Sequence, residues 1–145
     1  MEPKDLHVKV LNRKQAVKLQ YRQPTGTKAA LVSISSVGER YGACPRPGGD
    51  VCRVLYLNFD DVTDKGNGYL FTMQDALKVK NFVEACLENG TTTLYVHCDE
   101  GLSRSAAVAR ALHRHYGLPM GNVEYREGSR PNPHVYGLML EALEN

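Results

Sequence analysis

Residues 96–105 read Val-His-Cys-Asp-Glu-Gly-Leu-Ser-Arg-Ser, and this stretch decides the fold of the chain. An apolar, β-branched run precedes it at residues 92–96, and an alanine-rich run follows it at residues 105–112. The first pattern predicts a strand and the second a helix, so Cys98 lies in a loop between them. Backbone N–H groups that converge at such a helix start bind phosphate-like anions and stabilise a thiolate. Cys98 is therefore a candidate nucleophile, and the planar guanidinium of Arg104 can hold two phosphoryl oxygens.

The spacing of this loop carries a family resemblance. His97 and Cys98, five further residues, and then Arg104 and Ser105 resemble the signature loop of the cysteine-dependent protein tyrosine phosphatases. With Gly101 and Ser103 the stretch is similar to the small dual-specificity branch and its bacterial and phage-like members. The resemblance covers most of residues 29–145. The phosphate-binding residues that it implies are Asp99, Glu100, Gly101, Leu102, Ser103 and Arg104. The plain alternative is a buried thiol with a surface arginine nearby.

Length and charge narrow the class of protein. The chain has 145 residues, enough for one domain with a core and too few for two. Its net charge of +2 is too small to indicate nucleic acid or an anionic membrane as partner. No apolar run is long enough to span a bilayer, and the N-terminal residues contain no apolar signal segment. We expect one phosphatase domain over residues 1–145, monomeric and cytoplasmic.

The remaining elements follow from hydrophobic periodicity and helix caps. Strands are predicted over residues 6–11, at an edge of the sheet, and over 29–35, 53–59 and 92–97. Helices are predicted from an Asn12 cap to about Tyr21, over 73–88 behind a Thr72 cap, over 104–116, and after Asn132. This order predicts an α/β fold with a central, mainly parallel sheet of about four to five strands and helices on both faces.

Two adjacent carboxylates, Asp60 and Asp61, follow the third predicted strand. The carboxyl ends of parallel strands face the ligand crevice, which places them on the same rim as Cys98. The resemblance implies a general acid on such a loop, and Asp61 matches its position best. Asp60 is one residue earlier. The alternative is that one or both of these aspartates only cap the next turn.

The resemblance also implies a mechanism. The Cys98 thiolate attacks phosphorus to form a phosphocysteine, while the loop N–H groups and Arg104 stabilise the transition state. Asp61 protonates the leaving oxygen, and Ser105 donates a hydrogen bond to the Cys98 sulfur. His97 orients the loop. No metal and no other cofactor is expected.

The expected substrate is a phosphorylated protein or peptide. It carries phosphotyrosine, with phosphoserine and phosphothreonine as a second class, and the loop should also bind phosphate, vanadate or sulfate. Asp99 and Glu100 stand where many relatives have neutral or basic residues, which argues against a phosphoinositide. A rhodanese-like sulfurtransferase and a catalytically silent phosphopeptide-binding module stay open as alternatives.

Several other side chains have two interpretations each. Arg40 and Arg46 lie in a loop rich in glycine and proline, where they either contact substrate or are simply solvated. Arg130 and His134 precede the last helix, where they either reach the cleft or belong to its capping segment. Of the remaining cysteines, Cys44 and Cys52 flank the loop with poor spacing for zinc, and Cys86 is predicted in the core.

Overall fold

The computed structural model describes residues 3–38 and 44–145. One sheet has the strand order β3-β2-β4-β1-β5, and every neighbouring pair is parallel. Its strands are β1 (His7–Leu11), β2 (Ala29–Ser35), β3 (Val51–Asn58), β4 (Thr93–His97) and β5 (Val123–Glu124). The predicted α/β fold with a parallel central sheet is confirmed.

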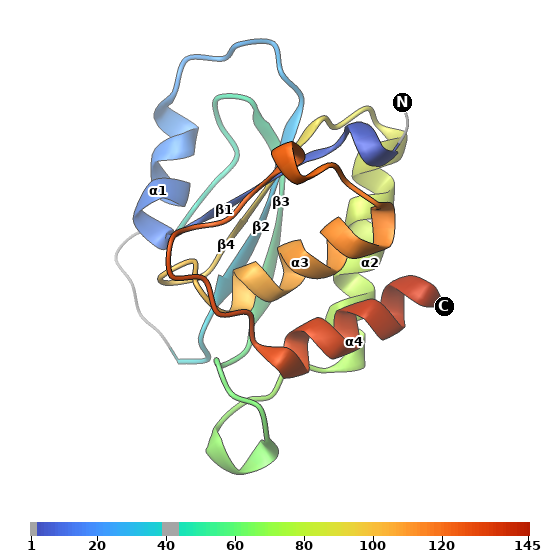
Figure 1. Cartoon of the computed structure of the whole chain (residues 1–145). Coiled ribbons are helices and arrows are strands. Elements are labelled where there is room, and N and C mark those ends of the chain that lie inside the picture. Colours follow the sequence, from blue (N-terminus) through green and yellow to red (C-terminus); the bar gives the residue numbers. More distant parts are fainter. Residues whose placement is uncertain (1–2, 39–43) are drawn as a thin grey trace.

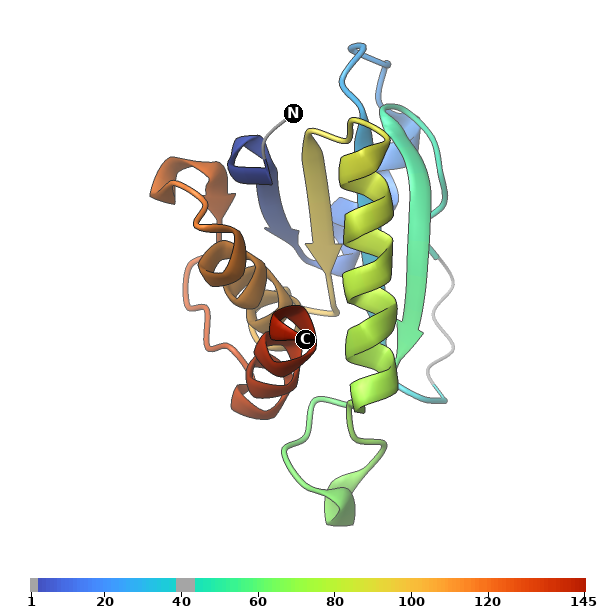
Figure 2. The same ribbon diagram turned by 90° about the vertical axis from the view of Figure 1, so that its right-hand side faces the viewer.

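Helices cover both faces of this sheet, as predicted. They are α1 (Arg13–Lys18), α2 (Met73–Glu88), α3 (Arg104–Tyr116) and α4 (Pro133–Glu144). Short 3₁₀ turns occur at Pro3–Asp5, Leu19–Tyr21, Lys65–Asn67 and Met120–Asn122. Figure 1 shows α1 on one face of the sheet and the other three helices on the opposite face. The strands β3 and β4 point toward the end of the sheet from which the loop between β3 and α2 extends (Figure 2).

The helix starts follow from their capping residues. The side chains of Asn12 and Thr72 each accept a hydrogen bond from the third residue of the helix that follows, and both are complete capping boxes. Asn132 accepts from the N–H groups of His134 and Val135 at the start of α4. These caps satisfy N–H groups that have no partner within the helix. All three predicted caps are confirmed.

Two apolar clusters hold the layers together. The larger one packs the sheet against α2, α3 and α4, and β2 contributes buried residues along almost its whole length. The smaller one lies under α1 and contains Ala16, Leu19, Ala29, Leu31 and Val51. Burial on both faces explains why residues 29–35 form a nearly continuous apolar run. Within the described part of the chain, no helix combines the length and the apolar character needed to cross a bilayer.

The structure corrects the predicted edge position of β1 and the predicted start of β3, and it divides the first predicted helix into two parts. The strand expected at an edge, β1, lies inside the sheet, because the two-residue strand β5 pairs with Val8 and Lys9. The helix expected from Asn12 to Tyr21 ends at Lys18 and continues as a 3₁₀ turn. The strand β3 begins at Val51, two residues before the predicted start. A strand of two residues is too short to show any periodicity, which is why β5 was missed.

Candidate active site

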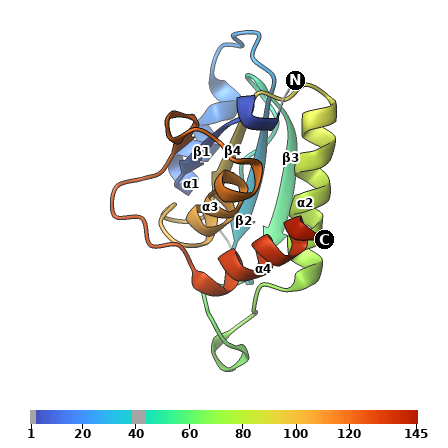
Figure 3. The ribbon, with the colours of Figure 1, turned by 45° about the vertical axis from the view of Figure 1, so that its right-hand side comes forward.

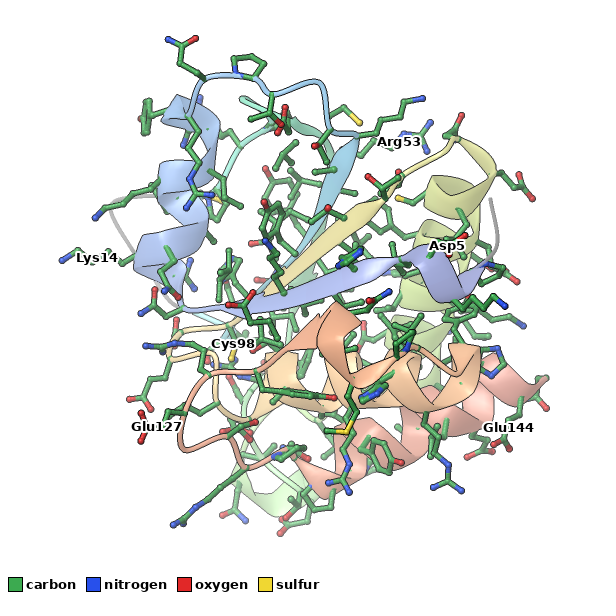
Figure 4. The ribbon with its side chains drawn as sticks, turned by 45° about the horizontal axis from the view of Figure 1, so that its top comes forward. Asp5, Lys14, Arg53, Cys98, Glu127 and Glu144 are labelled. Atoms are coloured by element: carbon green, nitrogen blue, oxygen red, sulfur yellow. The ribbon has the colours of Figure 1, made fainter. Side chains whose placement is uncertain are left out.

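A cavity of about 270 Å³ lies at the carboxyl end of the sheet. Cys98 follows β4 directly, and Arg104 is the first residue of α3. Figure 4 shows Cys98 beyond the end of β4, between α1 and α3. The cavity is lined by Asp61, Cys98, Asp99, Glu100, Leu102, Ser103 and Arg104. The cavity thus brings Cys98, Arg104 and most of the loop between them together with one aspartate of the preceding loop, whereas Gly101 and Ser105 do not line it.

Residues 98–104 form the signature loop. The carbonyl groups of residues 99, 100, 102 and 103 accept hydrogen bonds from residues that do not line the cavity. The N–H of Arg13 donates to the Asp99 carbonyl at 3.1 Å. The N–H groups of Arg130 and Asn132 donate to the carbonyls of residues 102 and 103 at 2.7 and 3.1 Å. Arg126 Nη1 donates to the carbonyl of residue 100. Because the C=O and N–H of one peptide point in opposite directions, the N–H groups of residues 100, 101, 103 and 104 point away from these donors. This arrangement is suited to an anion-binding nest.

Gly101 is required for this loop conformation. Its φ of +72° lies in the left-handed region, which side chains rarely adopt. A Cβ at this position would lie 2.5 Å from the carbonyl oxygen of Leu11 and 2.8 Å from Cδ of Arg126. Both the backbone conformation and the close packing against β1 therefore exclude any larger residue.

The Cys98 thiol is buried and held by its neighbours. Its Sγ lies 3.1 Å from Ser105 Oγ, within hydrogen-bond distance. Nδ1 of the fully buried His97 lies 3.1 Å from the Cys98 carbonyl oxygen, and Nε2 lies 2.6 Å from Ser33 Oγ. Because a carbonyl oxygen can only accept, Nδ1 carries the proton and Nε2 accepts from Ser33. Burial lowers the pKa of His97 to about 4, so the ring is neutral and acts as a brace for the loop.

Arg104 is buried at the wall of the cavity, and its guanidinium is only partly hydrogen-bonded. Its Nη1 donates to the carbonyl oxygen of Phe59 at 2.8 Å and to Ser36 Oγ at 2.9 Å. Its Nη2 lies 3.4 Å from Asp99 Oδ2. Its Nε is buried and has no partner among the residues that the structure describes. A buried donor without a partner destabilises the protein by about 1–3 kcal/mol, so this N–H is suited to receive an anion.

The two adjacent aspartates make different contacts. Asp61 Oδ1 accepts hydrogen bonds from Ser103 Oγ at 2.8 Å and from Asn132 Nδ2 at 2.9 Å, at the edge of the cavity. The Asp60 carboxylate accepts from the N–H groups of Val37 and Tyr69 at 3.1 and 2.8 Å. Asp60 therefore ties three chain segments together, while Asp61 faces the signature loop.

The remaining candidates lie in capping and loop positions. His134 Nε2 donates to the carbonyl oxygen of Phe71 at 2.7 Å, and Arg130 contributes its backbone N–H to the signature loop. Neither they nor the exposed Arg46 line the cavity. Arg40 lies outside the described residues. Among residues 3–38 and 44–145, no three His, Cys, Asp or Glu side chains are close enough to hold a metal ion.

The other cysteines lie away from the cavity. Cys44 and Cys52 are exposed, and neither forms a disulfide. Cys86 is buried on α2 in the larger apolar cluster, which confirms the prediction that it belongs to the core. Burial also raises the pKa of the Cys86 thiol, which makes it less reactive.

Four side chains make contacts at the site that the sequence prediction did not assign to them. They are Arg13, Ser36, Arg126 and the side-chain amide of Asn132. Asn132 was predicted only as a helix cap, and it combines that role with the contact to Asp61. Arg13 begins a helix, whereas Ser36 and Arg126 lie in connecting segments, and none of these positions gives a local signal of a long-range contact. Composition and periodicity therefore could not identify them.

No protein-family model and no curated protein matches the chain. Solved structures do match. The human tyrosine phosphatase-like serine/threonine/tyrosine-interacting protein has a TM-score of 0.61 at 23% identity, over 91% of this chain and 87% of its own. Human DUSP28 has a TM-score of 0.59 at 19% identity, over 94% and 91%. PTPMT1, solved in complex with PI(5)P, has a TM-score of 0.60 at 15% identity, over 99% and 94%. The chain therefore has the protein tyrosine phosphatase-like fold, in the form found in dual-specificity phosphatases.

Proposed function

We propose that the chain is a cysteine-dependent phosphatase of the small dual-specificity branch, which hydrolyses phosphotyrosine monoesters and, as a second class, phosphoserine and phosphothreonine monoesters. The observation that carries the proposal is the convergence of three groups on one cavity of about 270 Å³. These groups are the Cys98 thiol, the Asp61 carboxylate and Arg104, whose Nε is buried and unpaired within the described residues.

In the first step the Cys98 thiolate attacks phosphorus, and the bond from phosphorus to the leaving oxygen breaks. The N–H groups of the signature loop and Arg104 bind the equatorial oxygens, on which negative charge is spread in the transition state. Asp61 gives its proton to the leaving phenolate or alkoxide. The products are a phosphocysteine and the dephosphorylated side chain.

In the second step water attacks the phosphocysteine and the Cys98 thiolate leaves. Asp61, now deprotonated, accepts a proton from that water. The Ser105 hydroxyl lies 3.1 Å from the sulfur and can donate a hydrogen bond to the departing thiolate. Phosphate is then released, and the site returns to its starting state.

The dimensions and charge of the cavity support a small phosphoryl group as the part of the substrate that enters. Pockets that enclose a drug-sized ligand have volumes of about 300–1,000 Å³, and this cavity is smaller. Glu100 also lines it, and its carboxylate would repel additional phosphates beside the reacting one. These features favour a singly phosphorylated side chain over a phosphoinositide headgroup, although PTPMT1 was solved with PI(5)P.

The test is phosphate release from one enzyme preparation given phosphotyrosine, phosphoserine and phosphothreonine peptides, phosphoinositides and thiosulfate. We expect release from phosphotyrosine peptides and no sulfur transfer from thiosulfate. Cys98→Ser should abolish the release, because a serine hydroxyl stays protonated in this loop. Appreciable release by a contamination-free Cys98→Ser preparation would contradict the covalent mechanism.

One observation favours a second candidate, a phosphopeptide-binding module without turnover. A matched structure carries the name of a phosphatase-like interacting protein. Such a module would bind phosphotyrosine peptide and inorganic phosphate without releasing phosphate. Binding by the wild-type chain in the absence of turnover would therefore favour the module over the enzyme.

A further inference from the structure

Three charged side chains lie next to one another at the signature loop: Asp99 and Arg104 belong to the loop, and Arg13 comes from α1. Arg13 is the first residue of α1, Asp99 follows Cys98, and Arg104 is the first residue of α3. Arg13 donates to Asp99 Oδ1 through Nε at 3.2 Å and through Nη2 at 2.9 Å. The second oxygen, Asp99 Oδ2, lies 3.4 Å from Arg104 Nη2. One carboxylate thus bridges two guanidinium groups.

The position of Arg13 is fixed by further contacts. Its backbone N–H donates to the Asp99 carbonyl at 3.1 Å, and its Nη2 also donates to Ser35 Oγ at 2.9 Å. The Arg13 side chain is only 14% exposed, against 30% for that of Asp99. Partial burial reduces the screening of this ion pair by water and salt. The pair is therefore a fixed feature of the site rather than a loose surface contact.

Asp99 needs such a partner if the loop is to bind an anion. It lines the same cavity as Cys98, so its negative charge opposes both the thiolate and a phosphate dianion unless neighbouring cations offset it. The guanidinium of Arg13 supplies the compensating charge from the side of α1. The other carboxylate oxygen lies near Nη2 of Arg104, a residue that lines the cavity and whose Nε has no partner among the described residues.

We propose that Arg13 is a positioning residue of the site: it compensates the charge of Asp99 and fixes the carboxylate that orients the Arg104 guanidinium toward the bound phosphoryl group. The proposal rests on the proposed function and adds to it a residue far from the signature loop in sequence. It also gives a role to Asp99, an acidic residue inside an anion-binding loop. Arg13 itself does not line the cavity, and it acts through Asp99.

The test compares Arg13→Gln, Asp99→Asn and the double variant, with Lys14→Gln as the matched control. Lys14 is the next residue on α1, it is exposed, and its side chain points away from Cys98 (Figure 4). Each variant is assayed for binding of inorganic phosphate by calorimetry and for kcat and KM on an aryl phosphate. Thermal unfolding of each variant shows that it is folded.

We expect Arg13→Gln to weaken phosphate binding and raise KM about tenfold, a typical coupling for charged groups in contact. Lys14→Gln should stay within about twofold of wild type, as expected for an exposed surface charge. Adding Asp99→Asn to Arg13→Gln should restore most of the lost phosphate affinity, because the carboxylate whose charge Arg13 no longer offsets is removed. A purely structural role of Arg13 would not be rescued in this way. Asp99→Asn alone should lower kcat more than it lowers phosphate affinity, because Arg104 loses its orienting partner.

Two outcomes would overturn the role of Arg13. One is an Arg13→Gln variant with the same phosphate affinity and KM as Lys14→Gln. The other is a double variant that binds phosphate no better than Arg13→Gln. Arg13→Lys keeps the charge and should retain most of the affinity, and a loss as large as that of Arg13→Gln would also contradict charge compensation. Failure of the proposed function looks different, because the wild-type chain would then release no phosphate from any aryl phosphate.

Discussion

The two loops that meet at the cavity are held in opposite ways. The carbonyl groups of the signature loop are bound from outside by α1, Arg126 and the segment before α4. The loop of residues 60–70 extends beyond the sheet, below α4, and most of its residues are exposed (Figure 3). It is fastened at its ends, where the buried rings of Phe59 and Phe71 lie 4.6 Å apart and Asp60 binds Tyr69.

This difference in how the two loops are held agrees with the catalytic role that we propose for each of them. The signature loop must present fixed N–H groups to an anion, since donors that need no rearrangement stabilise the transition state best. The 60–70 loop must bring one carboxylate to the leaving group, and its contact with the signature loop is made through Asp61 and Asn132. Variants of the two loops should therefore differ in what they lose, either the leaving-group dependence of the rate or the stability of the fold.

The largest effect is expected when the general acid is removed. Asp61→Asn should lower the rate on phosphotyrosine by a factor on the order of 10²–10⁴, because the leaving phenolate is no longer protonated. The loss should shrink on aryl phosphates whose phenols are more acidic, since they need less protonation. The measurement is kcat/KM on a series of aryl phosphates of graded phenol pKa.

Asp60→Asn is the matched control for that series. Its carboxylate accepts from Val37 and Tyr69 and holds the base of the loop, so we expect a smaller loss that does not depend on the leaving group. A steeper leaving-group dependence for Asp60→Asn would place the general acid one residue earlier. If neither variant showed any dependence, both assignments would be wrong.

A second effect concerns the stability of the folded chain, which depends on the charge of His97, the residue that braces the signature loop. Burial, together with the nearby Arg13 and Arg104, lowers the pKa of His97 to about 4 from an ordinary value of 6.5. Below pH 6.5 the unfolded chain binds a proton at this residue that the folded chain does not bind, so stability falls as the pH decreases. Between pH 6.5 and pH 4 we expect a loss of about 3 kcal/mol in the free energy of unfolding.

Denaturant unfolding at several pH values measures this loss. His97→Gln should remove this contribution to the slope between pH 6.5 and pH 4, even though its stability at neutral pH is lower. His115→Gln is the control, because His115 is exposed on α3. An unchanged slope in His97→Gln would show that the ring does not stay neutral in the folded chain.

The smallest effect tests the link between the two loops. Serine is as good an N-cap as asparagine, so Asn132→Ser should preserve the start of α4 while its short side chain no longer reaches Asp61. We expect a loss of about tenfold on phosphotyrosine, the scale of a lost hydrogen bond to a charged group. It should show the same leaving-group dependence as Asp61→Asn, only weaker. Equal losses on all leaving groups would mean that Asn132 supports the signature loop alone.

The sequence allowed the helices, most of the sheet and the signature loop to be predicted. Their signals are local: a capping box at Thr72, an apolar run at residues 29–35, and a strand, loop and helix around Cys98. The interior position of β1 was not predictable in this way. It depends on pairing with Val123 and Glu124, more than 100 residues away.

The contacts that complete the site are also long-range. Arg13 and Asp99 are 86 residues apart in sequence, and Asp61 and Asn132 are 71 apart. One sequence shows which side chains can ionise or donate, but not which of them the packing brings together. This is why Asp99 could be read as a charge opposed to the site, whereas the structure places it between two arginines.

The most direct test of the central claim is the mass of the enzyme quenched in acid during turnover of an aryl phosphate. Acid quenching preserves a thiophosphate ester long enough for the modified peptide to be identified. We predict one added phosphoryl group, located on Cys98, with more of it in a variant whose second step is slowed, Ser105→Ala. Steady turnover with no phosphoryl group on the enzyme, or with the group on another residue, would contradict catalysis through a phosphocysteine.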